Sequence, residues 1–244
     1  MMELNILHLY PDLMSLYGEY ANLAVLCRHL GAMGVQAAVR AVEPEDTPDL
    51  STADMIYMGA GTERGQKAAL TALHPYASEL KAAAERGAVF LFTGNAMELL
   101  GASVTDAAGK VWAGLGLADY TTVETERRVP VDVIAAPVLW EAPAVGFMNK
   151  CSTTKGIVSP LFNSLELGFG NEAEHGPEGY VSGNVFATHI TGPVLVKNPA
   201  FTDLIIRRLL ALRGWEMPEP LPVLPHEREA YEVTLRELRA RVKG

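Results

Sequence analysis

Apolar and polar positions in the first hundred residues alternate between apolar runs of strand length and amphipathic stretches of helix length. Strands are predicted at residues 4–10, 35–42, 54–58 and 89–92. Helices are predicted between them, one ending at Gly31 and two at about 66–73 and 75–86. This order predicts an α/β fold with a doubly wound, mainly parallel sheet. Ligands of such sheets bind beyond the carboxyl ends of the strands.

The pattern changes between residues 110 and 192, where shorter apolar runs are separated by turn residues. Strands are predicted there at residues 129–134, 145–149, 165–170 and 185–190. We expect them to add antiparallel strands to one edge of the sheet. The acidic loop N-E-A-E-H-G-P-E-G at residues 171–179 is expected to be a solvated surface feature.

The C-terminal pattern divides the chain into three predicted segments. Residues 1–213 form the main domain and end in a helix at 201–213. Residues 214–225 form a proline-rich linker, because proline prevents regular helix. Residues 226–244 form a terminal amphipathic helix, whose apolar stripe is Tyr231, Leu235, Leu238 and Val242. That stripe must cover either the body of the protein or a partner.

Charge and composition exclude several classes of function. The 244 residues include 20 basic and 29 acidic ones, and this net charge of -9 argues against nucleic acid or an anionic membrane surface as the main partner. No apolar run is long enough to span a bilayer and the sequence begins with a strand instead of a signal segment, so a cytoplasmic location is expected. Cys27 and Cys151 are interpreted as reduced thiols, the six histidines do not cluster, and neither a metal nor a cofactor is predicted.

The stretch from Val89 to Gly101, V-F-L-F-T-G-N-A-M-E-L-L-G, is built like a nucleophile elbow. A buried strand is followed by a sharp turn and then by the start of a helix. The residue at the tip is Gly94, which has no side chain to present. A second loop, from Gly59 to Gln66, has small residues whose backbone N–H groups can face a ligand. The sequence thus predicts the geometry of a catalytic site without its reactive side chain.

Six short stretches stand out in order along the chain. They are L-Y-P-D-L-M-S-L-Y-G-E-Y-A-N-L from Leu9, G-A-G-T-E-R-G-Q from Gly59, T-G-N-A-M-E-L-L-G from Thr93, V-G-F-M-N-K from Val145, G-F-G-N from Gly168 and T-H-I-T-G-P-V-L-V-K-N-P from Thr188. Together they resemble class I glutamine amidotransferases of the cobyric-acid-synthase type, and most closely the glutaminase subunit of lipid II isoglutaminyl synthase. The resemblance implies a flavodoxin-like amidotransferase domain over residues 1–213. It also implies a Mur-ligase-related partner subunit in the amidation of lipid II, a peptidoglycan precursor.

The sequence departs from that family at two positions that the family's chemistry needs. The family's elbow cysteine, whose thiolate attacks the side-chain amide of glutamine, corresponds to Gly94. The family's general-base histidine, which precedes a Gly-Pro pair, corresponds to Thr191. Glycine cannot form a thioester, and threonine cannot take and return a proton near neutral pH. The resemblance thus implies a glutaminase fold without its nucleophile and base.

Two other residues are candidate substitutes for the missing pair. His189 lies two positions before Thr191, so on a strand it would face the same side, displaced by about 6–7 Å. Cys151 follows V-G-F-M-N-K, a segment that lies near the pocket in the family, and is the candidate thiol. The alternative for Cys151 is an ordinary packed cysteine without a catalytic role.

Further positions match ligand-binding positions of the family. Arg127, in E-T-E-R-R, matches an arginine that reads the glutamine carboxylate, and Arg128 is the alternative by one position. Asn149 matches within the family's G-F-x-N segment, although Lys150 stands where histidine is usual. The loop that supplies an oxyanion-hole N–H in the family is matched by Gly59, Ala60 and Gly61.

The sequence leaves three hypotheses of function. The first is an amidotransferase-like subunit that binds the Mur-ligase-related partner and has no glutaminase activity. The second is an active glutaminase that uses a rearranged pair, Cys151 with His189. The third is a regulatory subunit whose pocket binds glutamine or a related amino acid without cleaving it. Ammonia release from glutamine separates the second hypothesis from the other two.

Overall fold

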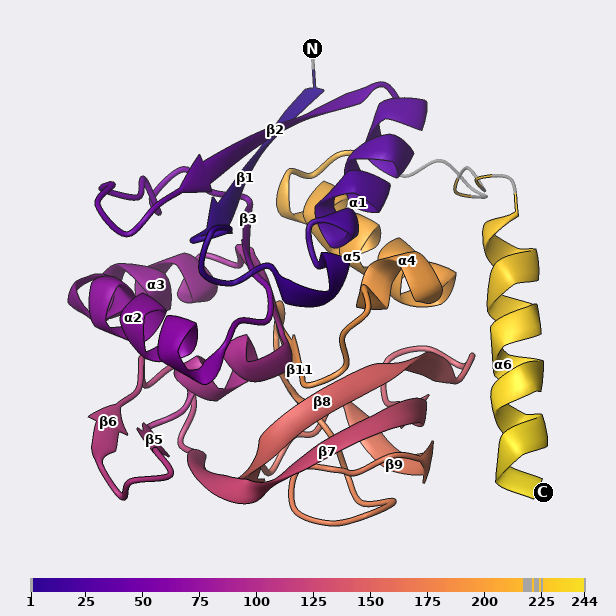
Figure 1. Cartoon of the computed structure of the whole chain (residues 1–244). Helices are drawn as coiled ribbons and strands as arrows, with labels where there is room; N and C mark the ends of the chain where they lie inside the picture. Colours follow the sequence, from indigo (N-terminus) through magenta and orange to yellow (C-terminus); the bar gives the residue numbers. More distant parts are fainter. Residues whose placement is uncertain (1, 217–220, 222–223, 225, 244) are drawn as a thin grey trace.

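Two β-sheets organise the computed structural model, which describes residues 2–216, 221, 224 and 226–243 (Figure 1). The first sheet has the strand order β10-β11-β4-β3-β1-β2. Its strands are β1 (Met2–Leu9), β2 (Val35–Val42), β3 (Met55–Met58), β4 (Val89–Thr93), β10 (Tyr180–Ser182) and β11 (Val185–Thr188). All neighbours are parallel except β10 and β11, which are antiparallel. The α/β class, the mainly parallel sheet and an antiparallel edge strand are therefore confirmed.

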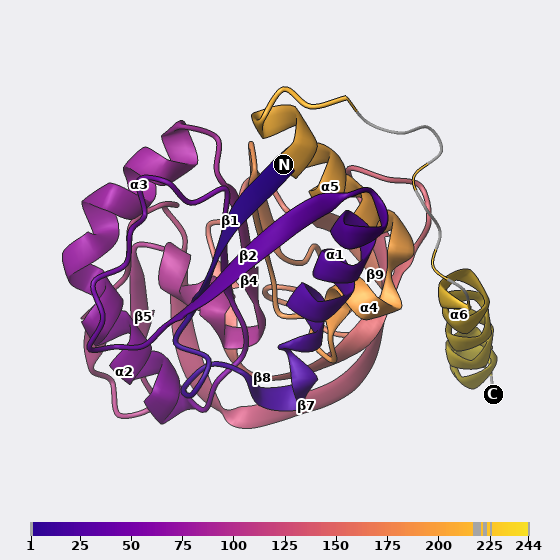
Figure 2. The same ribbon diagram turned by 90° about the horizontal axis from the view of Figure 1, so that it is seen from above.

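Helices cover both faces of this sheet (Figure 2). One face carries α1 (Ala21–Ala32) and α5 (Pro199–Leu212), which follows the short α4 (Val194–Lys197), and the other carries α2 (Glu63–Leu73) and α3 (Ala77–Glu85). The alternation of β1 explains this division. Leu4 and Ile6 point into the core under α1 and α5, whereas Leu7 and Leu9 point into the core under α2 and α3.

Short 3-10 helices mark the turns of this half of the chain, at η1 (Leu16–Gly18), η2 (His74–Tyr76) and η3 (Gly94–Leu100). The helix expected from residue 75 begins at Ala77, because Pro75 lies in η2. The helix expected from residue 66 begins at Glu63, because Thr62 caps it. The Thr62 hydroxyl oxygen accepts a hydrogen bond of 3.0 Å from the Gly65 N–H.

Most strands of the second half form a sheet of their own. They are β5 (Ser103–Thr105), β6 (Val111–Ala113), β7 (Thr121–Pro137), β8 (Ala144–Lys155) and β9 (Phe162–Leu167), in the order β6-β5-β7-β8 with β9 also on β7. The prediction that residues 129–134, 145–149 and 165–170 extend the first sheet is therefore wrong. The reason is that β7 and β8 form a long antiparallel hairpin that satisfies its own hydrogen bonds, and that β10 already occupies the outer edge of β11.

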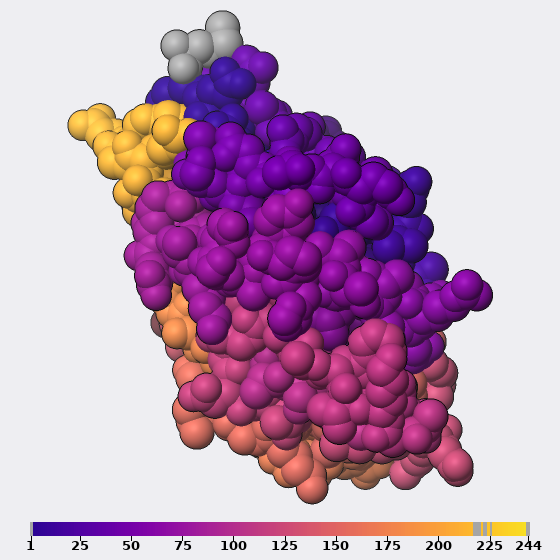
Figure 3. Space-filling model, turned by 90° about the vertical axis from the view of Figure 1, so that its left-hand side faces the viewer, coloured from indigo at the N-terminus to yellow at the C-terminus, as the bar shows by residue number. Residues whose placement is uncertain are grey.

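The two sheets meet at Phe147 of β8 and Thr191, which follows β11. These two residues exchange backbone hydrogen bonds, of 3.4 Å from the Phe147 N–H and 2.7 Å from the Thr191 N–H. In the space-filling view, indigo to purple residues of the first half cover the upper part of one face and pink residues of the second sheet the lower part (Figure 3). The seam between the sheets is therefore a place where distant segments of the chain come together.

The terminal helix α6 (Glu227–Lys243) lies beside the second sheet (Figure 1). Leu238 is buried in a small cluster with Ile134 and Val145, and Tyr231 and Leu235 pack against that cluster. Val242, which the predicted stripe includes, is 45% exposed instead. The apolar stripe of this helix thus covers the body of the protein.

The proline-rich linker predicted at residues 214–225 falls mostly outside the described residues, which include only 214–216, 221 and 224 of it. Leu221 is buried against the core that holds α1 and α5. Of the helices in the described part of the chain, none is long and apolar enough to cross a membrane.

Candidate functional site

The turn predicted after β4 is present and is centred on Gly94. β4 is buried along its whole length, and η3 begins directly at Gly94. The φ angle of Gly94 is 59°, in the left-handed region that favours glycine. The residues after the turn form a 3-10 helix, whereas the sequence only indicated a helix. The elbow therefore has a tip that glycine adopts without strain, and no side chain there.

Three segments that are far apart in the sequence meet at this elbow. A Cβ built on Gly94 would lie 3.0 Å from Cγ2 of Thr191 and 3.2 Å from Cα of Ala60. Asn95 holds the glycine loop, since its Nδ2 donates to the Gly61 carbonyl and its Oδ1 accepts from the Gly61 N–H, both at 2.9 Å. The positions that correspond by resemblance to the nucleophile, the base and the oxyanion loop are thus adjacent. The Gly61 N–H is already used and cannot serve a ligand.

A cavity of about 290 Å³ opens at this point, between the ends of β4 and β11 and the strands β7 and β8. Of the residues singled out in the sequence, it is lined by Ala60, Gly61, Gly94, Arg128, Asn149, Lys150, Cys151, His189 and Thr191. Gly59 does not line it, and glycine is needed there because a Cβ would lie 2.8 Å from that of Glu19. The cavity lies where a doubly wound sheet places its ligand.

Of the two consecutive arginines, Arg128 reaches the cavity and Arg127 does not. Both arginines are exposed and lie where the pairing of β7 with β8 shifts register, between Glu124 and Val129. The guanidinium of Arg128 forms an ion pair of 2.5 Å with Glu63. We therefore propose Arg128, and not Arg127, for the carboxylate-binding role. Its guanidinium is already paired with the carboxylate of Glu63.

Cys151 makes its polar contacts with the same ion pair. Its Sγ donates to Oε1 of Glu63 at 3.2 Å and accepts from Arg128 at 3.4 Å. Burial and the Glu63 carboxylate raise the pKa of the Cys151 thiol to about 12, so the thiol is protonated at neutral pH. His189 is held by other groups. The geometry therefore gives no support to a nucleophile-base pair of Cys151 and His189.

His189 lines the cavity and is buried between two carboxylates. Its Nδ1 lies 3.1 Å from Oε1 of Glu178, and its Nε2 lies 3.4 Å from Oε1 of Glu98. Burial by itself would raise the pKa of both glutamates, but hydrogen bonds and charge from His189 hold both pKa values below their ordinary range. Both carboxylates are therefore ionised at neutral pH, and His189 compensates them together with hydroxyl and amide donors and the nearby charge of Lys150.

Glu178 belongs to the acidic loop that was expected to be solvated, and for this residue the prediction is wrong. Its side chain is 0% exposed. The carboxylate accepts hydrogen bonds from the Thr188 hydroxyl at 2.6 Å and from the His189 backbone N–H at 2.8 Å. Asn171, at the start of the loop, is also buried and exchanges two hydrogen bonds with the Gly179 backbone. The two ends of the loop are thus tied into the core.

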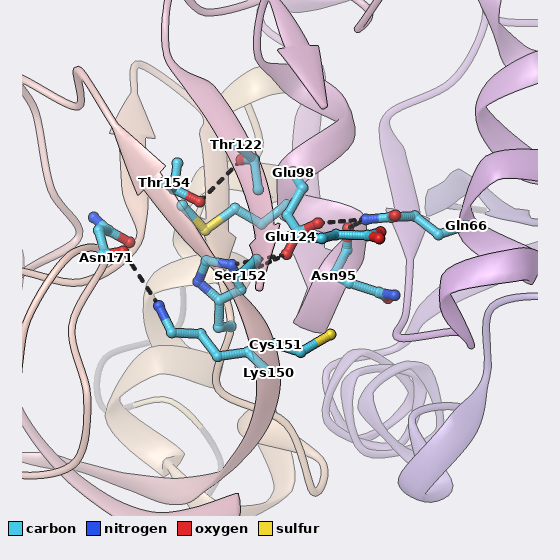
Figure 4. A network of polar contacts seen from close by, with 12 residues as sticks. Gln66, Asn95, Glu98, Thr122, Glu124, Lys150, Cys151, Ser152, Thr154 and Asn171 are labelled. Carbon is cyan, nitrogen blue, oxygen red and sulfur yellow. Dashed lines mark hydrogen bonds and ion pairs between the residues drawn. The ribbon is translucent and has the colours of Figure 1, made fainter. Parts of the chain in front are cut away.

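A polar network around Glu98 forms one wall of the cavity (Figure 4). Gln66 donates to Oε2 of Glu98 at 2.7 Å, and the Ser152 hydroxyl donates to Oε1 at 2.5 Å. On the other side of the wall, Lys150 donates to the Gly170 carbonyl at 2.5 Å, and burial lowers its pKa to about 8. Each of these donors has a protein acceptor. The wall is therefore a fixed structure and not a set of free reagents.

Glu19 is a buried carboxylate at this site that the sequence did not single out. Its Oε1 accepts from the Gly192 N–H at 3.1 Å, and its Oε2 accepts from the hydroxyls of Thr93 and Tyr57. It thereby ties the elbow to the loop at Thr191. Its one signal in the sequence is an acid within Y-G-E-Y-A-N-L, the first of the recognised stretches. Burial raises its pKa to about 7.

Stability is expected to change with the ionisation of Glu19. Its pKa is about 7 in the folded chain and 4.5 as an ordinary value, so the unfolded chain ionises first as the pH rises. The contribution of Glu19 to the free energy of unfolding therefore falls between these two pH values, by up to about 3 kcal/mol. Glu19→Gln should remove this fall, so that urea unfolding shows the variant gaining stability relative to the wild type from pH 5 to pH 8. The exposed Glu45→Gln is the control, and parallel curves for Glu19→Gln and wild type would contradict the prediction.

Comparison with known proteins finds similar sequences and a similar fold. Residues 5–199 match the family model of the CobB/CobQ-like glutamine amidotransferase domain. The chain is 26% identical over 214 residues to the "Lipid II isoglutaminyl synthase (glutamine-hydrolyzing) subunit GatD" of Staphylococcus aureus (strain N315), covering 88% of this chain and 87% of that protein. It is 29% identical over 199 residues to the subunit of the same name from Streptococcus pneumoniae (strain ATCC BAA-255 / R6), covering 80% and 76%. A solved glutamine amidotransferase has the same fold, with a TM-score of 0.50 at 14% identity over 85% of this chain and 98% of that chain.

Proposed function

The chain belongs to the CobB/CobQ-like glutamine amidotransferase family, and we propose that it is an amidotransferase-like subunit in lipid II amidation that does not hydrolyse glutamine. The first part of the proposal is supported by the two relatives, which are named as subunits of lipid II isoglutaminyl synthase and match most of its length. The second part is supported by the residues at the elbow.

The observation that carries the loss of hydrolysis is the juxtaposition of Gly94 and Thr191. Amide hydrolysis of this class needs a thiolate that attacks the carbonyl carbon and a base that moves the protons. Gly94 and Thr191 are neighbours in space and supply neither group. Of the described residues that line the cavity, Cys151 is the thiol and His189 the imidazole, and each is engaged by other partners.

The partner in this proposal is a Mur-ligase-related subunit. The resemblance implies such a ligase, and the relatives are themselves named as subunits of a synthase. The fold of this chain is kept around the elbow, since both faces of the first sheet have a buried core and a backbone bridge joins the two sheets. In the proposed complex the ligase uses free ammonia, and this chain stabilises the ligase.

Co-expression with the Mur-ligase-like protein of the same organism tests the proposal. We expect a complex that survives size-exclusion chromatography and that releases no ammonia from glutamine above background. The Staphylococcus aureus relative, named as glutamine-hydrolyzing, is the active control. Absence of a complex would contradict the proposal that a Mur-ligase-related subunit is the partner, and would favour an amino-acid-binding regulatory subunit. Ammonia release that Cys151→Ala abolishes would contradict the loss of hydrolysis and restore the rearranged pair.

A further inference from the structure

Another residue fills the space that a side chain at the elbow would need. A Cβ built on Gly94 would lie 2.5 Å from the Cβ of Ala60, closer than the 3.0 Å that real Cβ atoms keep from their neighbours. Both residues are buried, and both line the cavity. The glycine loop and the elbow are therefore in contact through the methyl group of Ala60.

Hydrogen bonds oppose a movement of either backbone that would make room. Asn95 joins the elbow to Gly61 through two hydrogen bonds of 2.9 Å, one in each direction. The carbonyl of Ala60 accepts a hydrogen bond of 2.9 Å from the Leu16 N–H. On the other side, β4 lies inside the sheet between β3 and β11. A shift of either segment that relieves the overlap therefore stretches and weakens these hydrogen bonds.

We infer that residues 60 and 94 form a complementary pair in which only one member can carry a side chain. With alanine at position 60, glycine is required at position 94. With glycine at position 60, the shortest contact of a Cβ at position 94 is removed, and only the contacts of 3.0 Å with Cγ2 of Thr191 and 3.2 Å with Cα of residue 60 remain. Ala60 is thus the residue that excludes a nucleophile from this cavity. This functional meaning rests on the proposed function, whereas the steric requirement does not.

Thr191 is the second neighbour of the missing side chain and makes the lesser contact. Its Cγ2 would lie 3.0 Å from a Cβ on Gly94, at the limit of what real contacts show. Its backbone is fixed by the exchange of hydrogen bonds with Phe147, and its hydroxyl donates to the Phe147 carbonyl at 3.1 Å. Ala60 therefore accounts for the larger part of the overlap.

A double-mutant cycle on thermal stability tests the pair. Gly94→Ala in the wild-type background should lower the Tm by roughly 5–10 °C, because overpacking and the positive φ act together. In the Ala60→Gly background the same substitution should lower the Tm by less than half as much. Gly183→Ala is the control for backbone strain without a steric contact. Gly183 has a φ of 56°, and no atom lies within 4 Å of an added Cβ.

Equal losses of Tm in the two backgrounds would overturn the inference. A loss for Gly94→Ala no larger than that for Gly183→Ala would do the same. If Gly94→Ala does not fold, the soluble yield of the double variant decides, because recovery supports the pair and continued insolubility overturns it. Neither the partner nor glutamine enters this measurement, so its result is independent of the complex and of ammonia release.

Discussion

Replacing His189 with alanine is expected to lower the free energy of unfolding by about 3–5 kcal/mol at pH 7. The substitution leaves Glu98 and Glu178 buried and ionised without the imidazole that lies between them. A buried charge that loses its partner is costly, because the interior cannot replace the hydration that the charge gave up on folding. The expected loss is therefore much larger than that of an exposed histidine.

Urea unfolding measures this loss, and His226→Ala is the matched control. The side chain of His226 is 86% exposed, and its removal should change stability by less than about 0.5 kcal/mol. In the His189 variant, burial without compensation should raise the pKa of both glutamates above that of the unfolded chain. Stability lost at pH 7 is then partly recovered towards pH 5, where protonation removes the charges. A loss that is equal at both pH values would contradict the compensating role of His189.

The local pattern predicted the first half of the chain well, because β1, β3 and β4 are mostly buried and therefore appear as apolar runs. β2 spans Val35–Val42, as expected, and β4 ends one residue later than expected. In the second half the strands were predicted but their partners were not. Alternation assigns a residue to a face of a sheet, whereas the pairing of β7 with β8 depends on hydrogen bonds between distant residues.

At the site, too, contacts between distant residues were not predicted from the local pattern. Glu178 lies in a loop whose Glu172 and Glu174 are exposed. The acidic composition of the loop predicted that all three side chains would be exposed to solvent. The burial of Glu178 depends on Thr188 and His189, which lie ten and eleven residues further along the chain. For Glu98 a local signal existed, since an acid within the apolar stretch A-M-E-L-L is unusual unless it has a buried partner.

The structure brings together three residues that the resemblance, and not the apolar pattern, singled out. Periodicity alone gives no reason to bring Ala60, Gly94 and Thr191 together. Even the resemblance did not show that the methyl group of Ala60 fills the space beside Gly94. That relationship depends on a distance between two loops, which only the folded chain defines.

Phe201→Ala is expected to lower the free energy of unfolding by about 3–5 kcal/mol. Phe201 is buried in α5 and stacks on Trp140, with ring centroids 4.7 Å apart, and it meets Phe186 edge-on at 5.9 Å. Trp140 also meets Phe162 at 5.7 Å. Phe186 belongs to β11 of the first sheet and Phe162 to β9 of the second, so this aromatic cluster joins the two sheets whose seam holds the cavity.

Chemical unfolding with two companion variants separates the role of the cluster from that of burial in general. Phe201→Leu keeps part of the volume and should lose less than Phe201→Ala, because the cavity left behind is smaller. Leu139→Ala changes a neighbour of Trp140 that is 38% exposed, and should stay within about 0.5 kcal/mol of the wild type. If Phe201→Ala lost less than about 1 kcal/mol, the other contacts between the sheets, among them that of Phe147 with Thr191, would have to hold them together. The cavity would then depend on those contacts and not on the aromatic cluster.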